Sequence, residues 1–313
     1  MDFTLRQVQC FVAVADTGQV SLAGSALGLS QSAITESIQG LEKKTGLKLV
    51  KRHRRGVGLT REGYQFLRYA RGILSAVADA KWLARSSNVN LRGTVRLGVP
   101  PTVAGYFLAA PLMRFQRLYP NVNVGIIEID MTKIERALLD EAIDVALLLH
   151  PDTLDSSHID TITMFSSRRR LWIAPSHPLA SVSKIRLRDI TKERYLLLTT
   201  DNNTETTSLY WSKHKLKPNI SLRTSSIEAI RNLVARGAGV TILSDLVYRP
   251  WSLEGDRIEA RSLAEQIPDL KIGIANKKAS KIDNSVVEFR NFFRQEIGVH
   301  RSVETAQIGL SSG

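Results

Sequence analysis

The first residues of one predicted helix carry side chains that could recognise DNA bases. A glutamine amide pairs with adenine through two hydrogen bonds, hydroxyl groups contact several bases, and a glutamate accepts a hydrogen bond from the cytosine amino group. The candidate residues are Gln31, Ser32, Thr35 and Glu36. The alternative for the first three is ordinary polarity on an exposed helix face. The alternative for Glu36 is a salt bridge with a nearby basic residue.

Two short helices separated by a tight turn would position these side chains. Ser21 predicts the start of the first helix, and Gly28 supplies a left-handed turn. Ser30 predicts the cap of the second helix, which covers residues 31–44. The second helix carries an apolar stripe formed by Ile34, Ile38 and Leu41. This pattern predicts a helix-turn-helix whose second helix enters the major groove.

A basic, glycine-containing segment follows this helix. Two β-prone runs, residues 46–52 and 53–60, are predicted to form a wing beside the helix-turn-helix. Between residues 43 and 55 there are seven basic residues and no acidic one. Basic side chains of the wing would neutralise DNA phosphates or enter the minor groove, and the candidates are Arg52, Arg54 and Arg55. A solvated basic face is the alternative.

The charge of the whole chain points to a polyanionic partner. The 313 residues carry a formal charge of +13, and residues 1–90 contain 13 of the 43 basic residues but 6 of the 30 acidic ones. More than half of the net charge therefore lies in this first part. Such a charge favours nucleic acid or an anionic membrane surface. The adjacent helix-turn-helix pattern favours double-stranded DNA.

The single cysteine and the start of the chain indicate a cytoplasmic protein. Cys10 excludes an intramolecular disulfide, and its apolar helical surroundings predict a buried core thiol rather than a reactive one. Residues 1–6 do not begin a basic segment followed by a long apolar run, so we expect no signal peptide. No apolar run approaches the roughly 18 residues of a membrane span, so no membrane partner is expected.

Residues suited to catalysis or metal binding do not form a recognisable set. The six histidines show no paired metal spacing, and one cysteine cannot build a thiolate site. The Ser-x-x-Lys pattern at residues 181–184 lacks the partner motifs of a serine hydrolase, and no phosphate-binding glycine loop is present. We therefore predict no enzymatic activity and no cofactor.

A long helix is predicted to connect the N-terminal part to the rest of the chain. Thr60 can cap it, and it extends through about residue 86. Apolar residues recur along it in alternating steps of four and three, which is typical of a coiled coil. They are Phe66, Ala70, Ile73, Val77, Ala80 and Ala84. We expect this seam to pair two chains, and the alternative is packing onto the same chain.

From Gly93 the pattern changes to alternating strands and helices, which predicts a parallel sheet covered by helices. The first set comprises strands at 94–99, 122–127 and 143–149 and helices at 103–118 and 133–140. The second set comprises strands at 171–174, 195–198, 220–223 and 240–243 and helices at 208–214 and 227–235. A strand at 271–275 and a helix at 285–297 are predicted to return to the first set.

Ligands bind outside the carboxyl ends of strands in open α/β folds, and this rule selects nine candidate residues. They are Pro101, Thr102, Val103, Asp130, Met131, Thr200, Ser225, Ser226 and Thr241. Helix N-termini near Thr102 and Ser226 suit a carboxylate, so we expect a small organic effector that bears one. Helix capping is the alternative for Thr102 and Ser225. Asp130 could favour a cationic group, with a plain surface carboxylate as the alternative.

The N-terminal residues resemble the winged helix-turn-helix of LysR-type transcriptional regulators. The match spans residues 5–63 and includes Leu5-Arg6-Gln7, Ala26-Leu27, Leu29-Ser30-Gln31-Ser32-Ala33-Ile34-Thr35 and Leu59-Thr60-Arg61-Glu62-Gly63. Three positions depart from the family pattern. Ser32 stands where proline is usual, Glu36 where arginine is common, and Val50 where phenylalanine is usual. The first two departures affect the expected base preference and leave the fold unchanged.

Fragments of the second part resemble the effector domain of the same family, two α/β lobes like those of a periplasmic-binding protein. They include Gly93-Thr94-Val95-Arg96-Leu97-Gly98, Asp144-Val145-Ala146, His177-Pro178-Leu179-Ala180 and Arg236-Gly237-Ala238-Gly239-Val240. Ile129 and Ser244 replace a usual glycine and a common proline near the expected cleft. The resemblance implies promoter DNA as partner, homodimers with antiparallel linker helices, and dimers of dimers. RNA polymerase is a further candidate partner.

The predicted fold class is α/β, with a winged helix-turn-helix at residues 1–59, a linker and dimerisation helix at 60–90, an effector domain at 91–297 and a tail at 298–313. Lobe I takes residues 91–165 and 268–297, and lobe II takes residues 166–267. The predicted function is sequence-specific transcription regulation by an effector bound between the lobes. The alternatives are a solute-binding protein, an enzyme with an added DNA-binding domain, and a repressor that needs no effector.

Overall fold

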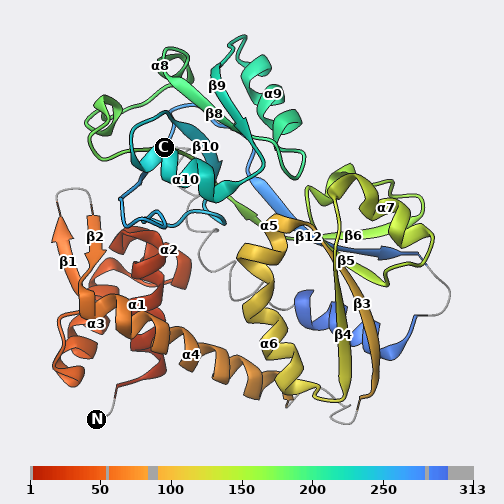
Figure 1. Ribbon diagram of the computed structural model, residues 1–313. Helices are drawn as coiled ribbons and strands as arrows, with labels where there is room; N and C mark the ends of the chain where they lie inside the picture. Colours follow the sequence, from red (N-terminus) through yellow and green to blue (C-terminus); the bar gives the residue numbers. More distant parts are fainter. Residues whose placement is uncertain (1–2, 54–55, 84–90, 279–281, 295–313) are drawn as a thin grey trace. The chain divides into compact units, whose positions relative to one another are not determined.

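The computed structural model describes residues 3–53, 56–83, 91–278 and 282–294 (Figure 1). The chain forms two compact units, one built chiefly from residues 1–91 and the other chiefly from residues 92–294. The predicted tail at 298–313 and the end of the predicted linker, residues 84–90, lie outside the described residues. Among the described residues, every helix is either too short or too polar to cross a lipid bilayer.

The first unit is a helical bundle with a two-stranded hairpin. Its elements are α1 (Leu5–Thr17), α2 (Val20–Leu27), α3 (Gln31–Thr45), β1 (Val50–His53), β2 (Gly56–Leu59) and α4 (Arg61–Leu83). The hairpin is antiparallel, and Figure 1 shows it as two orange arrows beside the helices. The predicted helix-turn-helix and wing are both present.

Local capping explains where the helices of this unit begin and end. The Ser30 hydroxyl accepts a hydrogen bond from the Ala33 N–H, and Gly28 has a φ of 64° in the turn before it. Thr60 caps α4 by accepting from the Gly63 N–H. The prediction for Ser21 is wrong, because α2 already begins at Val20 and Ser21 lies inside the helix.

The core of the first unit includes the beginning of α4. Phe66 packs edge-on against Phe11 with ring centroids 5.4 Å apart, and Ala70 is fully buried. These two residues of the predicted coiled-coil seam therefore pack onto their own chain. Cys10 is also fully buried in this core, as its apolar surroundings predicted.

The second unit contains a five-stranded sheet in its first lobe. The strands are β3 (Gly93–Val99), β4 (Val122–Glu128), β5 (Val145–Leu149), β6 (Ile159–Ser167) and β12 (Leu270–Lys277), in the order β4-β3-β5-β12-β6. The predicted parallel pairing holds for β3 with β4 and β5, whereas β12 runs antiparallel to both β5 and β6. The nine-residue strand β6 was not predicted.

Helices flank this sheet. One continuous helical stretch consists of α5 (Pro101–Val103), a π-helical segment η1 (Ala104–Leu108) and α6 (Ala109–Leu118). Phe115 of α6 packs against Phe289 and Phe292 of the helix at 284–294, with ring centroids 4.9 and 5.4 Å apart. The remaining elements are α7 (Met131–Leu139), which contacts β5, β6 and β12, and the short turn η2 (Pro151–Thr153).

The second lobe has two smaller sheets. Strands β7 (Arg169–Ile173), β10 (Thr241–Ser244) and β11 (Glu259–Arg261) are antiparallel in the order β10-β7-β11, and β8 (Arg194–Leu198) pairs with β9 (Asn219–Thr224) in parallel. A bridge between Tyr195 and Val240 links the two sheets. The helical elements are η3 (Pro178–Ala180), α8 (Leu187–Ile190), α9 (Asn203–Lys213) and α10 (Ile227–Ala235).

Candidate functional site

The start of α3 presents the four predicted base-contacting residues toward solvent. Gln31, Ser32 and Glu36 are exposed, and Thr35 is partly exposed. The Thr35 hydroxyl donates to the Gln31 carbonyl oxygen at 2.9 Å, which keeps it close to the helix. Thr35 also lines a groove of about 320 Å³ between α3 and the wing strands, together with Gln39. The helix therefore offers polar side chains beside a concave surface.

The wing places part of the predicted basic cluster next to α3. Arg52 lies in strand β1, and Lys51 is exposed on the same strand. Arg54 and Arg55 lie outside the described residues. The described strands thus bring cationic residues to the hairpin that follows the base-contacting helix.

One buried carboxylate, Glu42, joins α3 to the wing. It accepts hydrogen bonds from the backbone N–H groups of Leu49 at 2.8 Å and Val50 at 3.1 Å and from Lys48 Nζ at 2.8 Å. Burial raises the pKa of Glu42, but the hydrogen bonds from Lys48 and the two amides outweigh burial and the pKa is lowered. No local sequence pattern indicates this role for Glu42, because its partners lie six to eight residues further along the chain.

Replacing Glu42 with alanine is expected to destabilise the first unit by about 2–3 kcal/mol, because two amide groups near the core lose their acceptor. Hydrogen exchange of the peptide covering residues 46–60 should speed up, since the wing loses its attachment to α3. The matched control is Glu62→Ala, which removes an exposed carboxylate from the first turn of α4. Equal protection of the wing peptide in both variants would show that Glu42 does not anchor it.

The nine predicted effector residues separate into several groups. Thr102 and Thr200 line one pocket between the lobes. Asp130 and Ser226 cap α7 and α10, where their side chains accept from Thr132 N–H and Ala229 N–H. Val103 and Met131 are buried, whereas Pro101 and Ser225 are exposed.

Thr241 does not reach this pocket. It is 1% exposed, and its hydroxyl donates to the Leu196 carbonyl oxygen at 2.8 Å. Its side chain thus satisfies a backbone acceptor between β8 and β10. Contact between Thr241 and a ligand stays a prediction.

The pocket is lined from both lobes. Thr102, Leu149, His150 and Leu270 come from the first lobe, and the second lobe contributes Arg169, Leu198, Thr200, Asp201, Asn203, Ile227, Leu243, Ser244 and Val247. The cavity between them measures about 30 Å³. Arg169 and Asp201 are buried polar residues that were not among the predicted site residues. Arg169 stands in a run of three arginines, a pattern more typical of a solvated surface.

Asp201 connects the two lobes through the backbone of the first. Its Oδ2 accepts a hydrogen bond from the Thr102 N–H at 3.1 Å. Thr102 is therefore not a helix cap, because the cap position belongs to Pro100. The anion-binding position expected at this helix start is occupied by the protein's own carboxylate.

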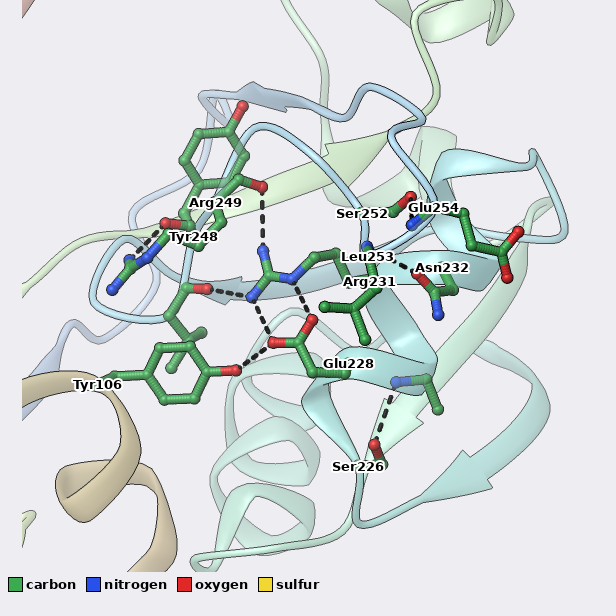
Figure 2. A network of polar contacts seen from close by, with 12 residues as sticks. Tyr106, Ser226, Glu228, Arg231, Asn232, Tyr248, Arg249, Ser252, Leu253 and Glu254 are labelled. Atoms are coloured by element: carbon green, nitrogen blue, oxygen red, sulfur yellow. Dashed lines mark hydrogen bonds and ion pairs between the residues drawn. The ribbon is translucent and has the colours of Figure 1, made fainter. Parts of the chain in front are cut away.

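A second contact between the lobes lies at the π-helical segment (Figure 2). The Tyr106 hydroxyl donates to Glu228 Oε1 at 2.6 Å, and Glu228 accepts from Arg231 Nε at 2.9 Å through its other oxygen. Arg231 is 1% exposed and also donates to the carbonyl oxygens of Val247 and Arg249. Burial raises the pKa of Glu228, but hydrogen bonds from Arg231 and Tyr106 outweigh burial and lower it.

His150 at the pocket gives the second unit a dependence on pH. Burial, and then the charge of Arg169, lower its pKa from 6.5 to about 4. Asp152 acts in the opposite direction, and Lys271 acts in the same direction as Arg169. Since the folded-state pKa is depressed, neutral His150 contributes stability above pH 6.5 that is lost as the pH falls toward 4.

The variant His150→Asn should remove this dependence, because asparagine does not titrate and accepts the left-handed backbone of this position (φ 49°). We expect the free energy of unfolding of the wild type to fall by up to about 3 kcal/mol more than that of the variant between pH 6.5 and 4, and by less where solvent screens the partly exposed ring. Urea unfolding at pH 7, 5.5 and 4.5 measures the difference. Parallel pH profiles would exclude His150 as the titrating group.

Comparison with known proteins agrees with both units. The bacterial regulatory helix-turn-helix profile of the LysR family matches residues 5–64, and the LysR substrate binding domain profile matches residues 89–298. A probable hydrogen peroxide-inducible genes activator of Mycobacterium xenopi is 32% identical over 182 residues, covering 58% of this chain and 95% of the relative. The regulator YvbU of Bacillus subtilis is 26% identical over 284 residues, covering 89% of this chain and 94% of the relative.

Solved structures show the same architecture. HinK, a LysR family regulator of Pseudomonas aeruginosa, has a TM-score of 0.62 and 26% identity, covering 96% of this chain and 100% of its own. Full-length BenM, at 22% identity and a TM-score of 0.57, covers 95% of this chain and 97% of its own and shares the fold. These relatives are transcriptional regulators rather than enzymes. The chain belongs to the LysR family of transcriptional regulators, with a helix-turn-helix that binds DNA and a substrate domain that binds a small effector.

Proposed function

We propose that this regulator recognises promoter DNA with the exposed start of α3 and that a small organic effector with a carboxylate group, bound in the pocket between the lobes, controls it. The observation that carries the proposal is the pocket itself, because both lobes line it and the hydrogen bond between Thr102 and Asp201 in its wall joins them. A ligand that changes lobe closure would change the DNA-bound state. A coupling free energy of about 1–3 kcal/mol corresponds to a 5- to 150-fold change in affinity.

The proposed assembly is a homodimer formed through α4, with two dimers forming a tetramer. Tyr64 and Tyr69 support this arrangement, since these large side chains on α4 are 62% and 63% exposed in the single chain. A dimer would present two copies of α3 to half-sites about one DNA turn apart. RNA polymerase is a further proposed partner.

Hydrogen peroxide is a second candidate signal, because some relatives are named as peroxide-inducible activators. Peroxide sensing by a thiol requires an accessible cysteine that can form a thiolate. The only cysteine of this sequence is Cys10, which is fully buried in the first unit. The chemistry of this chain therefore favours reversible binding of an organic effector.

The wing tests the DNA-binding part of the proposal. Replacing Arg54 and Arg55 with alanine should weaken binding to operator and random duplexes alike and reduce the slope of log K against log salt by about 2, because about two phosphate contacts are lost. Fluorescence anisotropy measures the affinity at several salt concentrations between about 50 and 200 mM, and these affinities give the slope. An unchanged slope would contradict phosphate contact by the wing.

A further inference from the structure

The pocket between the lobes has groups of opposite charge in its wall. We infer that its effector is an amino acid or a close analogue, with a carboxylate that pairs with Arg169 and an ammonium group that pairs with Asp201. This inference rests on the proposed function, in which this pocket holds the effector, and it adds the chemical class of the ligand.

Arg169 is the positive group. Its side chain is almost completely buried, with 4% exposure, and its Nη1 donates to the Pro268 carbonyl oxygen at 2.6 Å. Among the residues that the structure describes, no carboxylate forms an ion pair with it, and Asp269 acts on it only through space. A buried charge without a counter-ion is unfavourable. A ligand carboxylate would supply the missing anion, through the two-point geometry that a guanidinium offers.

Asp201 is the negative group, and it is 8% exposed. It accepts hydrogen bonds from the backbone N–H of Thr102 at 3.1 Å and from the Thr102 side chain, and no cation forms an ion pair with it within the described ranges. Burial, and then the charges of Asp130 and Glu128, raise the pKa of Asp201, so a cationic group of the ligand would stabilise its ionised form. Asp201 and the following Asn202 have φ values of 55° and 57°, the left-handed conformation that aspartate and asparagine adopt more often than most other non-glycine residues.

A simple carboxylic acid fits this pocket less well than an amino acid. An acid placed at the start of α5, as the sequence predicted, would lie against Asp201, which already occupies that position. Arg169 offers the acid group a buried cation in the wall of the same pocket, and Asp201 lines that pocket as well. An ammonium group there would neutralise the second buried charge.

The rest of the pocket wall is aliphatic and limits the side chain of the ligand. Leu149, Leu198, Ile227, Leu243 and Val247 supply this surface. The present cavity of about 30 Å³ is too small for an amino acid, so binding must separate the lobes or move these side chains. The expected ligand is an amino acid with an apolar side chain.

The test is a thermal-shift and calorimetric titration of the full-length protein with the twenty amino acids as probes. For each amino acid that binds, the acid without the amino group and the amine without the carboxylate are titrated as well. For leucine these are 4-methylpentanoate and 3-methylbutylamine. We expect at least one apolar amino acid to bind, with the matching acid and amine at least tenfold weaker.

Two variants assign the charges. Arg169→Gln should weaken binding of the amino acid at least tenfold, whereas the matched control Arg168→Gln, at an exposed neighbour, should not. Asp201→Asn should weaken binding of the amino acid at least tenfold, whereas the affinity for the matching acid should stay the same or rise. Should Arg169→Gln fail to fold by circular dichroism, Arg169→Lys keeps the charge but loses the planar pairing geometry, and it should still bind more weakly than wild type.

Two results would overturn the inference: no amino acid binds, or the matching acid binds as tightly as the amino acid. Failure of the proposed function is a separate result, since it requires that the wild-type protein show no preference for its upstream DNA. A protein that prefers its operator and responds to a simple acid would keep the proposed function and refute the amino-acid class.

Discussion

Replacing Gln31 with alanine is expected to lower the ratio of operator affinity to random-DNA affinity by about 5- to 150-fold. A glutamine that pairs with adenine through two hydrogen bonds contributes about 1–3 kcal/mol of discrimination. Gln31 is exposed at the first position of α3, where a helix in the major groove meets the bases. The binding to random DNA should stay the same, because phosphate contacts carry it.

The control for this variant is Gln65→Ala, which removes the same side chain from an exposed position of α4. Competition binding with operator and scrambled duplexes at one fixed salt concentration gives the ratio directly. If Gln31→Ala weakened both duplexes equally, Gln31 would contact the backbone or act through the fold. The assignment of base recognition to the start of α3 would then be wrong.

Removing the carboxylate of Glu228 is expected to destabilise the second unit by about 3 kcal/mol. The variant Glu228→Ala leaves the guanidinium of Arg231 buried without its anionic partner, and such one-sided removal is strongly unfavourable. It also breaks the hydrogen bond from Tyr106, which joins the lobes (Figure 2). Urea unfolding followed by tryptophan fluorescence reports on this site, because Arg231 lies 5.2 Å from the ring centroid of Trp172.

Two comparisons separate the contributions in this network. Tyr106→Phe removes only the hydrogen bond between the lobes and leaves the ion pair of Glu228 with Arg231 in place. It should lower the free energy of unfolding by about 0.5–1.5 kcal/mol. Glu205→Ala removes an exposed carboxylate from the first turn of α9 and should change stability little. If Glu228→Ala and Glu205→Ala had the same free energy of unfolding, Glu228 would not be the group that balances the charge of Arg231.

Local features of the fold were predictable from sequence where a residue acts on its near neighbours. The Ser30 cap, the Gly28 turn and the Thr60 cap follow from side-chain chemistry within three residues. The apolar stripe of α3 was predictable because its spacing is helical. Ser21 misled the prediction, since a serine near a helix start caps only when it occupies the boundary position itself.

Features that depend on residues far apart in the chain were not predictable. Strand β6 was not predicted because it pairs with β12, which lies more than a hundred residues later in the chain. The antiparallel direction of β12 has no local signal in the sequence. The ligand rule for α/β folds identified Thr102 and Thr200, which follow strands. It did not identify Arg169 or Asp201, whose burial is set by contacts with Pro268 and Thr102, each 99 residues away.

The most direct test of the central claim is the affinity of the full-length protein for a duplex from its own upstream region, measured against a scrambled duplex of equal length at physiological salt. We expect a preference of at least about a thousandfold for the upstream duplex. We also expect an effector bound in the pocket to change this preference. Equal affinity for the two duplexes, with and without candidate effectors, would contradict recognition of promoter DNA by α3.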